Sequence, residues 1–183
     1  MLKVESILLL GDSLIEYGDW SALLPGYRTV NRGLAGETAG ELAGRLAREL
    51  DQEEDPERII IFSGTNDLLL GDTSFPQVFV TMLPLLCHLC PETGVTVLGL
   101  APMTLLGPVP AALAQANRAL AAITRAAGCS FLDPGPEFAL HCRPVGNPCF
   151  LMDGVHLSPH GYAVLARIIR AHLQLSAGHG VQG

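Results

Sequence analysis

Apolar segments typical of buried β-strands alternate along this chain with longer segments of helical periodicity, and this alternation limits the possible folds most. The predicted strands are residues 7–10, 27–31, 58–63, 95–101 and 130–132. The predicted helices are residues 38–50, 75–89, 111–127 and 159–173. Such alternation favours a parallel sheet with helices on both faces, a three-layer α/β/α fold.

The composition agrees with a sheet that is buried on both faces. Apolar residues make up 49% of the chain and charged residues only 16%, as expected where strands are covered on both sides. A chain of 183 residues suits one domain. We expect this domain to span residues 1–175, and we expect the small, polar segment 176–183 to be a flexible tail.

The charge and the N-terminal sequence exclude several classes of partner. The net charge is −7, and the 11 Lys and Arg residues are scattered, so nucleic acid is not an expected partner. The apolar run at residues 6–10 is too short for a membrane span or a secretion signal. We therefore expect a cytoplasmic protein. The sequence does not indicate its oligomeric state.

Five cysteines, an odd number in a chain without an export signal, argue against a disulfide framework. Cys87 and Cys90 form a CxxC pair, but a zinc site needs a second pair of ligands at a matching spacing, and the sequence has none. We interpret them as two thiols on a packed helix. The sequence leaves open whether Cys142 and Cys149 pair.

Four short polar segments occur after predicted strands or just before the last predicted helix. They are Gly-Asp-Ser-Leu at 11–14, Asn-Arg-Gly-Leu-Ala-Gly at 31–36, Gly-Thr-Asn-Asp at 64–67 and Asp-Gly-Val-His at 153–156. Ligands in open α/β folds bind beyond the carboxyl ends of the strands. We therefore expect the four segments to meet at one edge of the sheet.

These segments contain the groups that acyl transfer through a serine requires. Ser13 needs a base to remove its proton, and the imidazole of His156 can serve. Asp153, three residues before His156, can hold the ring in one tautomer. The backbone N–H groups of Ser13 and Gly36, with the Asn66 side chain, can donate to a tetrahedral oxyanion.

Structural explanations exist for the same residues. Ser13 could be a helix N-cap, and Asn66 could be an ordinary turn residue. Gly33 competes with Gly36 for the oxyanion role, although each could simply be a turn glycine. We interpret Asp12 as a structural residue that fixes the turn through hydrogen bonds to the backbone.

The four segments, in this order, resemble the sequence blocks of the SGNH or GDSL hydrolases, and they span residues 7–162. The resemblance implies that Ser13, Gly36, Asn66 and His156 are the four residues that name the family, with Asp153 completing a triad. It also implies a flavodoxin-like sheet of strand order 2-1-3-4-5 and ester hydrolysis. The surrounding sequence is most similar to small bacterial esterases and to the platelet-activating-factor acetylhydrolase-like branch.

No cofactor and no metal are expected. His160 lies four residues after His156, a spacing that can bind metal on a helix, but Pro159 indicates that the helix only starts there. The apolar segment 103–110 follows the fourth predicted strand. It could form one wall of the acyl pocket, with Met103 and Leu105 in contact with substrate, or it could be a buried connection.

The expected partner is a small-molecule ester. A carbohydrate O-deacetylase, a thioesterase or a lysophospholipase could use the same site. A flavodoxin-like binding module without chemistry is disfavoured, because no glycine-rich phosphate loop follows the first strand. The sequence also lacks the G-x-S-x-G motif of α/β-hydrolases.

Overall fold

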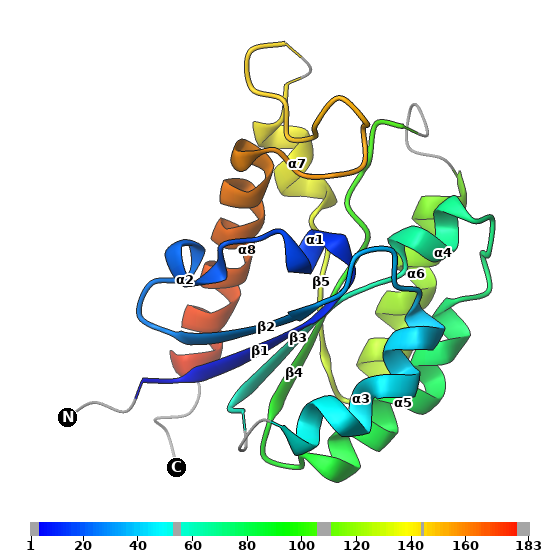
Figure 1. Cartoon of the computed structure of the whole chain (residues 1–183), viewed down its shortest axis with the longest axis vertical. Coiled ribbons are helices and arrows are strands. Elements are labelled where there is room, and N and C mark those ends of the chain that lie inside the picture. Colours follow the sequence, from blue (N-terminus) through cyan, green and yellow to red (C-terminus); the bar gives the residue numbers. More distant parts are fainter. Residues whose placement is uncertain (1–3, 53–55, 106–110, 144, 179–183) are drawn as a thin grey trace.

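A single five-stranded parallel sheet forms the centre of the computed structural model, which describes residues 4–52, 56–105, 111–143 and 145–178 (Figure 1). The strand order is β2-β1-β3-β4-β5, so the predicted order 2-1-3-4-5 is confirmed. The strands are β1 (Ser6–Gly11), β2 (Arg28–Gly33), β3 (Arg58–Phe62), β4 (Gly94–Leu98) and β5 (Ser130–Leu132).

Helices cover both faces of the sheet and give the predicted three layers. They are α1 (Ser13–Glu16), α2 (Trp20–Leu23), α3 (Ala39–Asp51), α4 (Thr65–Leu69), α5 (Pro76–Leu89), α6 (Ala111–Ala126), α7 (Gly135–His141) and α8 (Pro159–Gly178). On one side α5 packs against both α3 and α6; on the other, α8 packs against α2 and α7 (Figure 1).

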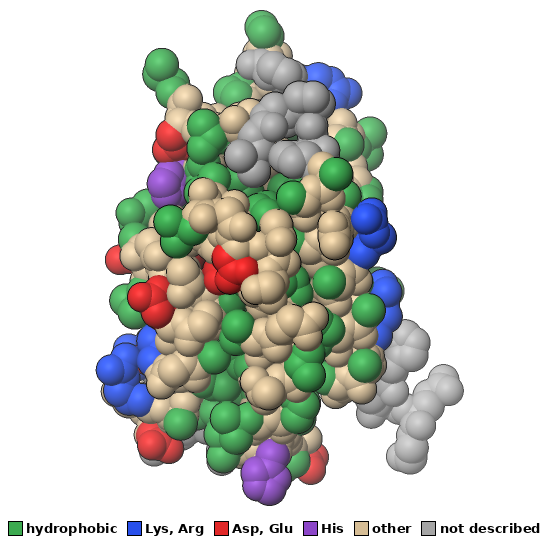
Figure 2. Space-filling view, turned by 90° about the vertical axis from the view of Figure 1, so that its right-hand side faces the viewer, with side chains coloured by type: hydrophobic (Ala, Val, Ile, Leu, Met, Phe, Trp, Pro, Cys, Tyr) green, Lys and Arg blue, Asp and Glu red, His purple; other side chains and the backbone are tan. Residues whose placement is uncertain are grey.

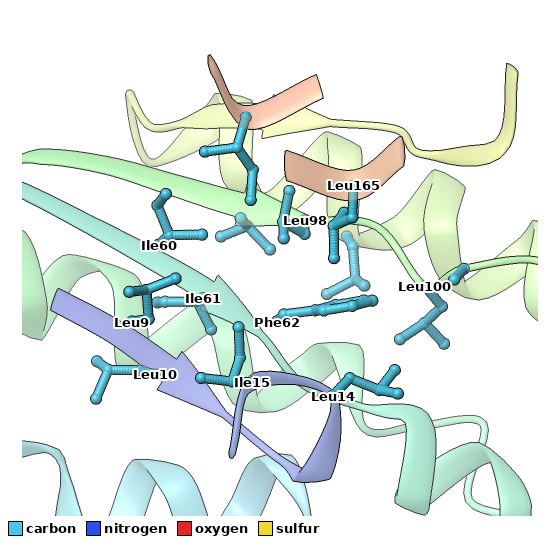
Figure 3. Packing of buried hydrophobic residues seen from close by; sticks show 14 of the residues in the cluster. Leu9, Leu10, Leu14, Ile15, Ile60, Ile61, Phe62, Leu98, Leu100 and Leu165 are labelled. Atoms are coloured by element: carbon cyan, nitrogen blue, oxygen red, sulfur yellow. The ribbon is translucent and has the colours of Figure 1, made fainter. Parts of the chain in front are cut away.

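The central strands are apolar because both of their faces are buried. Every residue of β1 is buried, and so are the last four residues of β3. Figure 3 shows part of this core, in which side chains of β1, β3 and β4 lie together with Leu165 of α8. Central strands packed in this way give the loops at their carboxyl ends a rigid base.

The long helices were predicted to within a few residues, and local capping explains their starts. Thr38 precedes α3 and forms a capping box with Glu41, which satisfies two backbone N–H groups that lack helical partners. Three helices of seven residues or fewer, α2, α4 and α7, were not predicted, because segments this short show no helical periodicity.

In the C-terminal part of the chain, the structure differs from one expectation and answers one question that the sequence left open. Helix α8 continues to Gly178, so residues 176–178 are helical instead of part of a tail, and residues 179–183 lie outside the described residues. Cys142 and Cys149 form a disulfide, with Cα atoms 5.3 Å apart. An odd number of cysteines argues against a framework that pairs all of them. It neither indicates nor excludes a single bridge such as this one.

Within the described ranges, none of the helices combines the length and the apolar character that crossing a bilayer requires.

Candidate active site

The four polar segments meet at the carboxyl edge of the sheet, as expected. Gly11 at the end of β1 lies opposite Gly33 at the end of β2, and the N–H of Leu34 donates to the carbonyl of Gly11. The side chain of Asn66, on α4, donates to the carbonyl of Glu37 at 2.9 Å. The fourth segment reaches the first through a contact between Ser13 and His156.

Ser13, His156 and Asp153 form a continuous hydrogen-bonded chain. The Ser13 Oγ lies 3.0 Å from the His156 Nε2, and the His156 Nδ1 lies 2.7 Å from Asp153 Oδ2. Ser13 is 6% exposed, whereas the His156 and Asp153 side chains are 33% and 47% exposed. The three side chains therefore join a nearly buried hydroxyl to a carboxylate that reaches solvent.

The environment of Asp153 keeps its carboxyl ionised. Its Oδ1 accepts hydrogen bonds from the backbone N–H groups of Val155 at 2.9 Å and His156 at 3.0 Å. The Val155 bond, followed by the bond with the His156 side chain, lowers the pKa of Asp153 to about 2. Since an ionised carboxylate can only accept, His156 donates through Nδ1, and Nε2 of the neutral ring can accept the Ser13 proton.

The turn that carries Asp153 and His156 packs against the loop after β4. Gly154 has a φ of +71°, and a side chain there would come within 2.6 Å of the Leu105 nitrogen. The Gly154 carbonyl accepts hydrogen bonds from the N–H groups of Thr104 at 2.8 Å and Leu105 at 3.1 Å. Glycine is therefore required at this position, and the β4 loop fixes the turn.

The two candidate substrate contacts in the β4 loop differ in exposure. Met103 is 3% exposed and belongs to the apolar core. Leu105 is 58% exposed and lies next to Gly154. Residues 106–110 lie outside the described part of the chain, so the rest of this loop cannot be assigned to the site.

Gly36 and Gly33 have different structural roles. Gly36 has a φ of +80°, and a Cβ there would meet no other atom within 4 Å. A Cβ at Gly33 would lie 2.2 Å from the Glu16 nitrogen, and the Gly33 N–H donates to the Asn31 side chain at 3.0 Å. Close packing against α1 thus explains Gly33, while Gly36 faces open space.

Hydrogen bonds hold the Gly36 turn beside α1 and α4. The Ala35 N–H donates to Glu16 Oε2 at 2.6 Å, and the Ala39 N–H donates to Asp67 Oδ2 at 2.9 Å. Within the part of the chain that the structure describes, the N–H groups of Ser13 and Gly36 have no acceptor. Sequence analysis missed Glu16; its position three residues after Ser13, on the same helix face, was the available signal.

Tyr17 follows Ser13 by one helical turn, and His160 follows His156 by four residues. The Tyr17 side chain is 58% exposed, and its ring centroid lies 5.5 Å from that of His156. The His160 Nε2 lies 3.1 Å from the carbonyl oxygen of His141. Among the described residues, no group of three or more His, Cys, Asp or Glu side chains could hold a metal ion.

Asp12, immediately before Ser13, is a buried capping residue. Its Oδ1 accepts a hydrogen bond from the Leu14 N–H at 2.9 Å, which makes Asp12 the N-cap of α1. The N-cap explanation for Ser13 is therefore wrong, and the structural interpretation of Asp12 is confirmed. The side chain is 0% exposed. Burial, with smaller effects of Asp67 and Glu37, raises the pKa of Asp12 to about 7.

This raised pKa predicts a pH-dependent effect of Asp12→Asn on stability. Between about pH 4 and pH 7 the folded protein keeps a proton on Asp12 that the unfolded chain has released. The contribution of Asp12 to the free energy of unfolding therefore falls as the pH rises through this range. When the pH is raised from 5 to 8, the free energy of unfolding of Asp12→Asn should therefore increase relative to that of wild type by on the order of 1–3 kcal/mol.

Urea unfolding of both proteins at the two pH values measures this difference. Asp51→Asn, at an exposed position, is the control and should show the same offset from wild type at pH 5 and at pH 8. If the difference in free energy of unfolding between Asp12→Asn and wild type were also the same at pH 5 and pH 8, the raised pKa of Asp12 would be contradicted.

A model of the GDSL-like lipase/acylhydrolase family matches residues 9–164. The chain belongs to this family. This GDSL-like hydrolase therefore acts on esters, and its family assignment agrees with the resemblance of the four sequence blocks. A search against curated proteins gave no match.

Solved structures similar to this GDSL-like hydrolase support the fold. One is a Streptococcus pneumonia protein described as a platelet activating factor (22% identity, 94% of this chain and 85% of that chain, TM-score 0.79). A second is the acetylxylan esterase Axe2 of Geobacillus stearothermophilus, with 19% identity over 91% of this chain and 93% of that chain and a TM-score of 0.73. A third is an acylhydrolase of Bacteroides fragilis, with 21% identity over 94% of this chain and 88% of that chain and a TM-score of 0.72. At these identities the likeness shows the fold alone.

Proposed function

We propose that this GDSL-like hydrolase cleaves carboxylic esters through an acyl-enzyme on Ser13, with His156 as general base and acid and Asp153 as its orienting carboxylate. The observation that carries the proposal is the 3.0 Å contact between the Ser13 Oγ and the His156 Nε2. The 2.7 Å contact between Asp153 and the other ring nitrogen supports the tautomer that the reaction needs.

The reaction follows from this arrangement in two halves. His156 Nε2 takes the Ser13 proton while Oγ attacks the ester carbonyl, and His156 returns that proton to the leaving alcohol as the C–O bond breaks. Water then loses a proton to His156 and attacks the acyl-enzyme carbonyl. The acid leaves, and the proton returns to the Ser13 oxygen. The proposal requires no cofactor and no metal.

Three donors would stabilise the oxyanion that forms in each half. The N–H groups of Ser13 and Gly36 are available, and the Asn66 amide has a second N–H besides the one bonded to Glu37. The bond to Glu37 fixes the direction of this amide before substrate binds. Donors already aimed at the developing charge lower the barrier without reorganisation.

A carbohydrate O-deacetylase on the same site is a second candidate, since one structural neighbour, Axe2, is an acetylxylan esterase. Comparing turnover of acetyl and octanoyl esters separates it from a longer-chain esterase.

We also propose a single domain. A cytoplasmic location stays a prediction, and the Cys142–Cys149 disulfide argues against it, because disulfides are rare in reducing compartments.

Labelling with a fluorophosphonate tests the nucleophile directly. The folded protein should gain one label by intact mass, and peptide mapping should place the label on Ser13. His156→Ala should label far more slowly, because the hydroxyl then lacks its base. A label on another serine, or active ester hydrolysis without any label, would contradict the assignment.

A further inference from the structure

A groove of about 1240 Å³ lies beside β5, between α6 and α7, and the function of Ser13 does not account for it. Apolar side chains from several elements line it, among them Leu100, Leu113, Phe131, Phe138 and Phe150. We call it the α6–α7 groove. Pockets for small molecules usually measure about 300–1,000 Å³, so this groove has room for an extended ligand.

The α6–α7 groove is continuous with the loops that hold the candidate active site. Thr104 and Leu151 line the groove. The Thr104 N–H donates to the Gly154 carbonyl, and the Leu151 N–H donates to the His156 carbonyl at 2.7 Å. One wall of the groove is therefore built from the segments that position Asp153 and His156.

The part of the groove formed by α6 is long. Leu113, Ala114, Asn117, Arg118, Ala121 and Arg125 line it. These residues lie on one face of the helix, at successive spacings of one, three, one, three and four. From the first to the last of them the helix rises about 18 Å. A strip of this length fits an extended hydrocarbon chain better than a compact acetyl group.

Basic side chains accompany this apolar surface. Arg118, Arg125 and Arg143 line the groove, three of the 11 Lys and Arg residues in a chain of net charge −7. Figure 2 shows basic side chains along the right-hand edge of the face it draws. Among the described residues that line the groove, one is acidic: Asp133, which accepts a hydrogen bond from the Gly135 N–H at 2.8 Å.

None of the three arginines has a carboxylate partner in the described ranges. Arg125 lies over the Phe131 ring, 5.9 Å from its centroid. Arg143 donates to the carbonyls of Ala139 and Cys142. These guanidinium groups lie beside apolar side chains and form no ion pair with a described carboxylate. They therefore complement a ligand that carries both an apolar chain and a negative charge.

We propose that the α6–α7 groove binds an anionic amphiphile, an apolar chain bearing a negatively charged group, and that esters of this class are the substrates. The choice of substrate rests on the proposed function of Ser13, whereas the binding itself does not. Neutral sugar acetates would leave both the apolar strip and the arginines without partners.

Direct binding tests the proposal with dodecanoate, below its micelle concentration, by titration calorimetry. Wild type should bind dodecanoate and should bind dodecyltrimethylammonium, which has the same chain and the opposite charge, at least about tenfold more weakly. Ala114→Trp, which fills the groove from a half-buried position, should weaken dodecanoate binding by about tenfold or more. Ala122→Trp, at an exposed position of α6 outside the groove, should bind as wild type does.

A second pair of variants tests the charge. The double variant Arg118→Gln/Arg125→Gln should weaken dodecanoate binding by about tenfold, whereas Arg48→Gln on α3 should have no effect. Equal affinity for the two surfactants, or unchanged binding in Ala114→Trp, would overturn the proposal. So would a wild-type dimer that Ala114→Trp converts to a monomer, because a second copy would then cover the groove.

Turnover separates this proposal from the function of Ser13. All four variants should hydrolyse p-nitrophenyl acetate at the wild-type rate, and only the groove variants should lose activity toward p-nitrophenyl dodecanoate. A wild-type protein that hydrolyses p-nitrophenyl acetate but does not bind dodecanoate would refute the groove alone. Absence of acetate turnover and of a Ser13 label in wild type would refute the function of Ser13 alone.

Discussion

Ser13→Ala is expected to lower kcat for p-nitrophenyl acetate by about 10⁴-fold or more. The variant keeps the His156–Asp153 pair and the backbone donors, but it has no oxygen to form the acyl-enzyme. Activity that remains would come from water attacking a substrate that the oxyanion donors still polarise. Steady-state kinetics on the purified proteins, from acetate to palmitate esters, give the value and the chain-length optimum.

The control for this variant is Ser21→Ala, on α2, where an exposed serine bonds to Asp19. It should retain wild-type kcat. Since Ser13 Oγ bonds only to the His156 ring among the described residues, Ser13→Ala should fold normally, and its circular dichroism spectrum should match wild type. A folded Ser13→Ala enzyme with kcat near wild type would refute the acyl-enzyme mechanism.

Asn66→Ala is expected to lower kcat by about 10²-fold to 10³-fold, or about 2.7–4 kcal/mol of transition-state stabilisation. The amide would donate to charge that develops only in the tetrahedral state, so kcat should fall much more than KM rises. The bond between Asn66 and the Glu37 carbonyl is also lost, which disturbs the Gly36 turn. Part of the decrease therefore comes from the loss of an aligned Gly36 N–H.

Asn147→Ala, at an exposed loop position, is the control and should keep wild-type kinetics. Unfolding curves for both variants separate a catalytic loss from a loss of folded protein. An Asn66→Ala enzyme whose kcat is unchanged would exclude the side chain from the oxyanion site, even if Ser13 and His156 keep their proposed roles.

The sequence predicted those features that depend on local chemistry or on burial. Ile59, Ile60 and Ile61 are consecutive because β3 is buried on both faces, and their pattern gave both the strand and the parallel sheet. The spacing of Asp153 and His156 likewise fixes a contact within one turn. Both features could be recognised without knowledge of the rest of the fold.

Features that depend on distant contacts could not be predicted in this way. The sequence around Tyr17 does not show that the turn at His156 approaches it, yet the two rings are neighbours in the structure. The groove combines residues of α6, α7 and the segment before Asp153, and no single segment of sequence shows it. The sequence also could not show that the side chain of Met103, in an apolar loop, is buried in the core.

The proposed nucleophile and its base are separated by 143 residues of chain, although their side chains touch. During synthesis the Ser13 turn can form on β1 long before the ribosome has made His156. Catalysis must therefore wait until the C-terminal part of the chain has docked. In a partly folded or truncated chain, Ser13 would have no base and no activity. The onset of activity during folding therefore shows when the contact between Ser13 and His156 has formed.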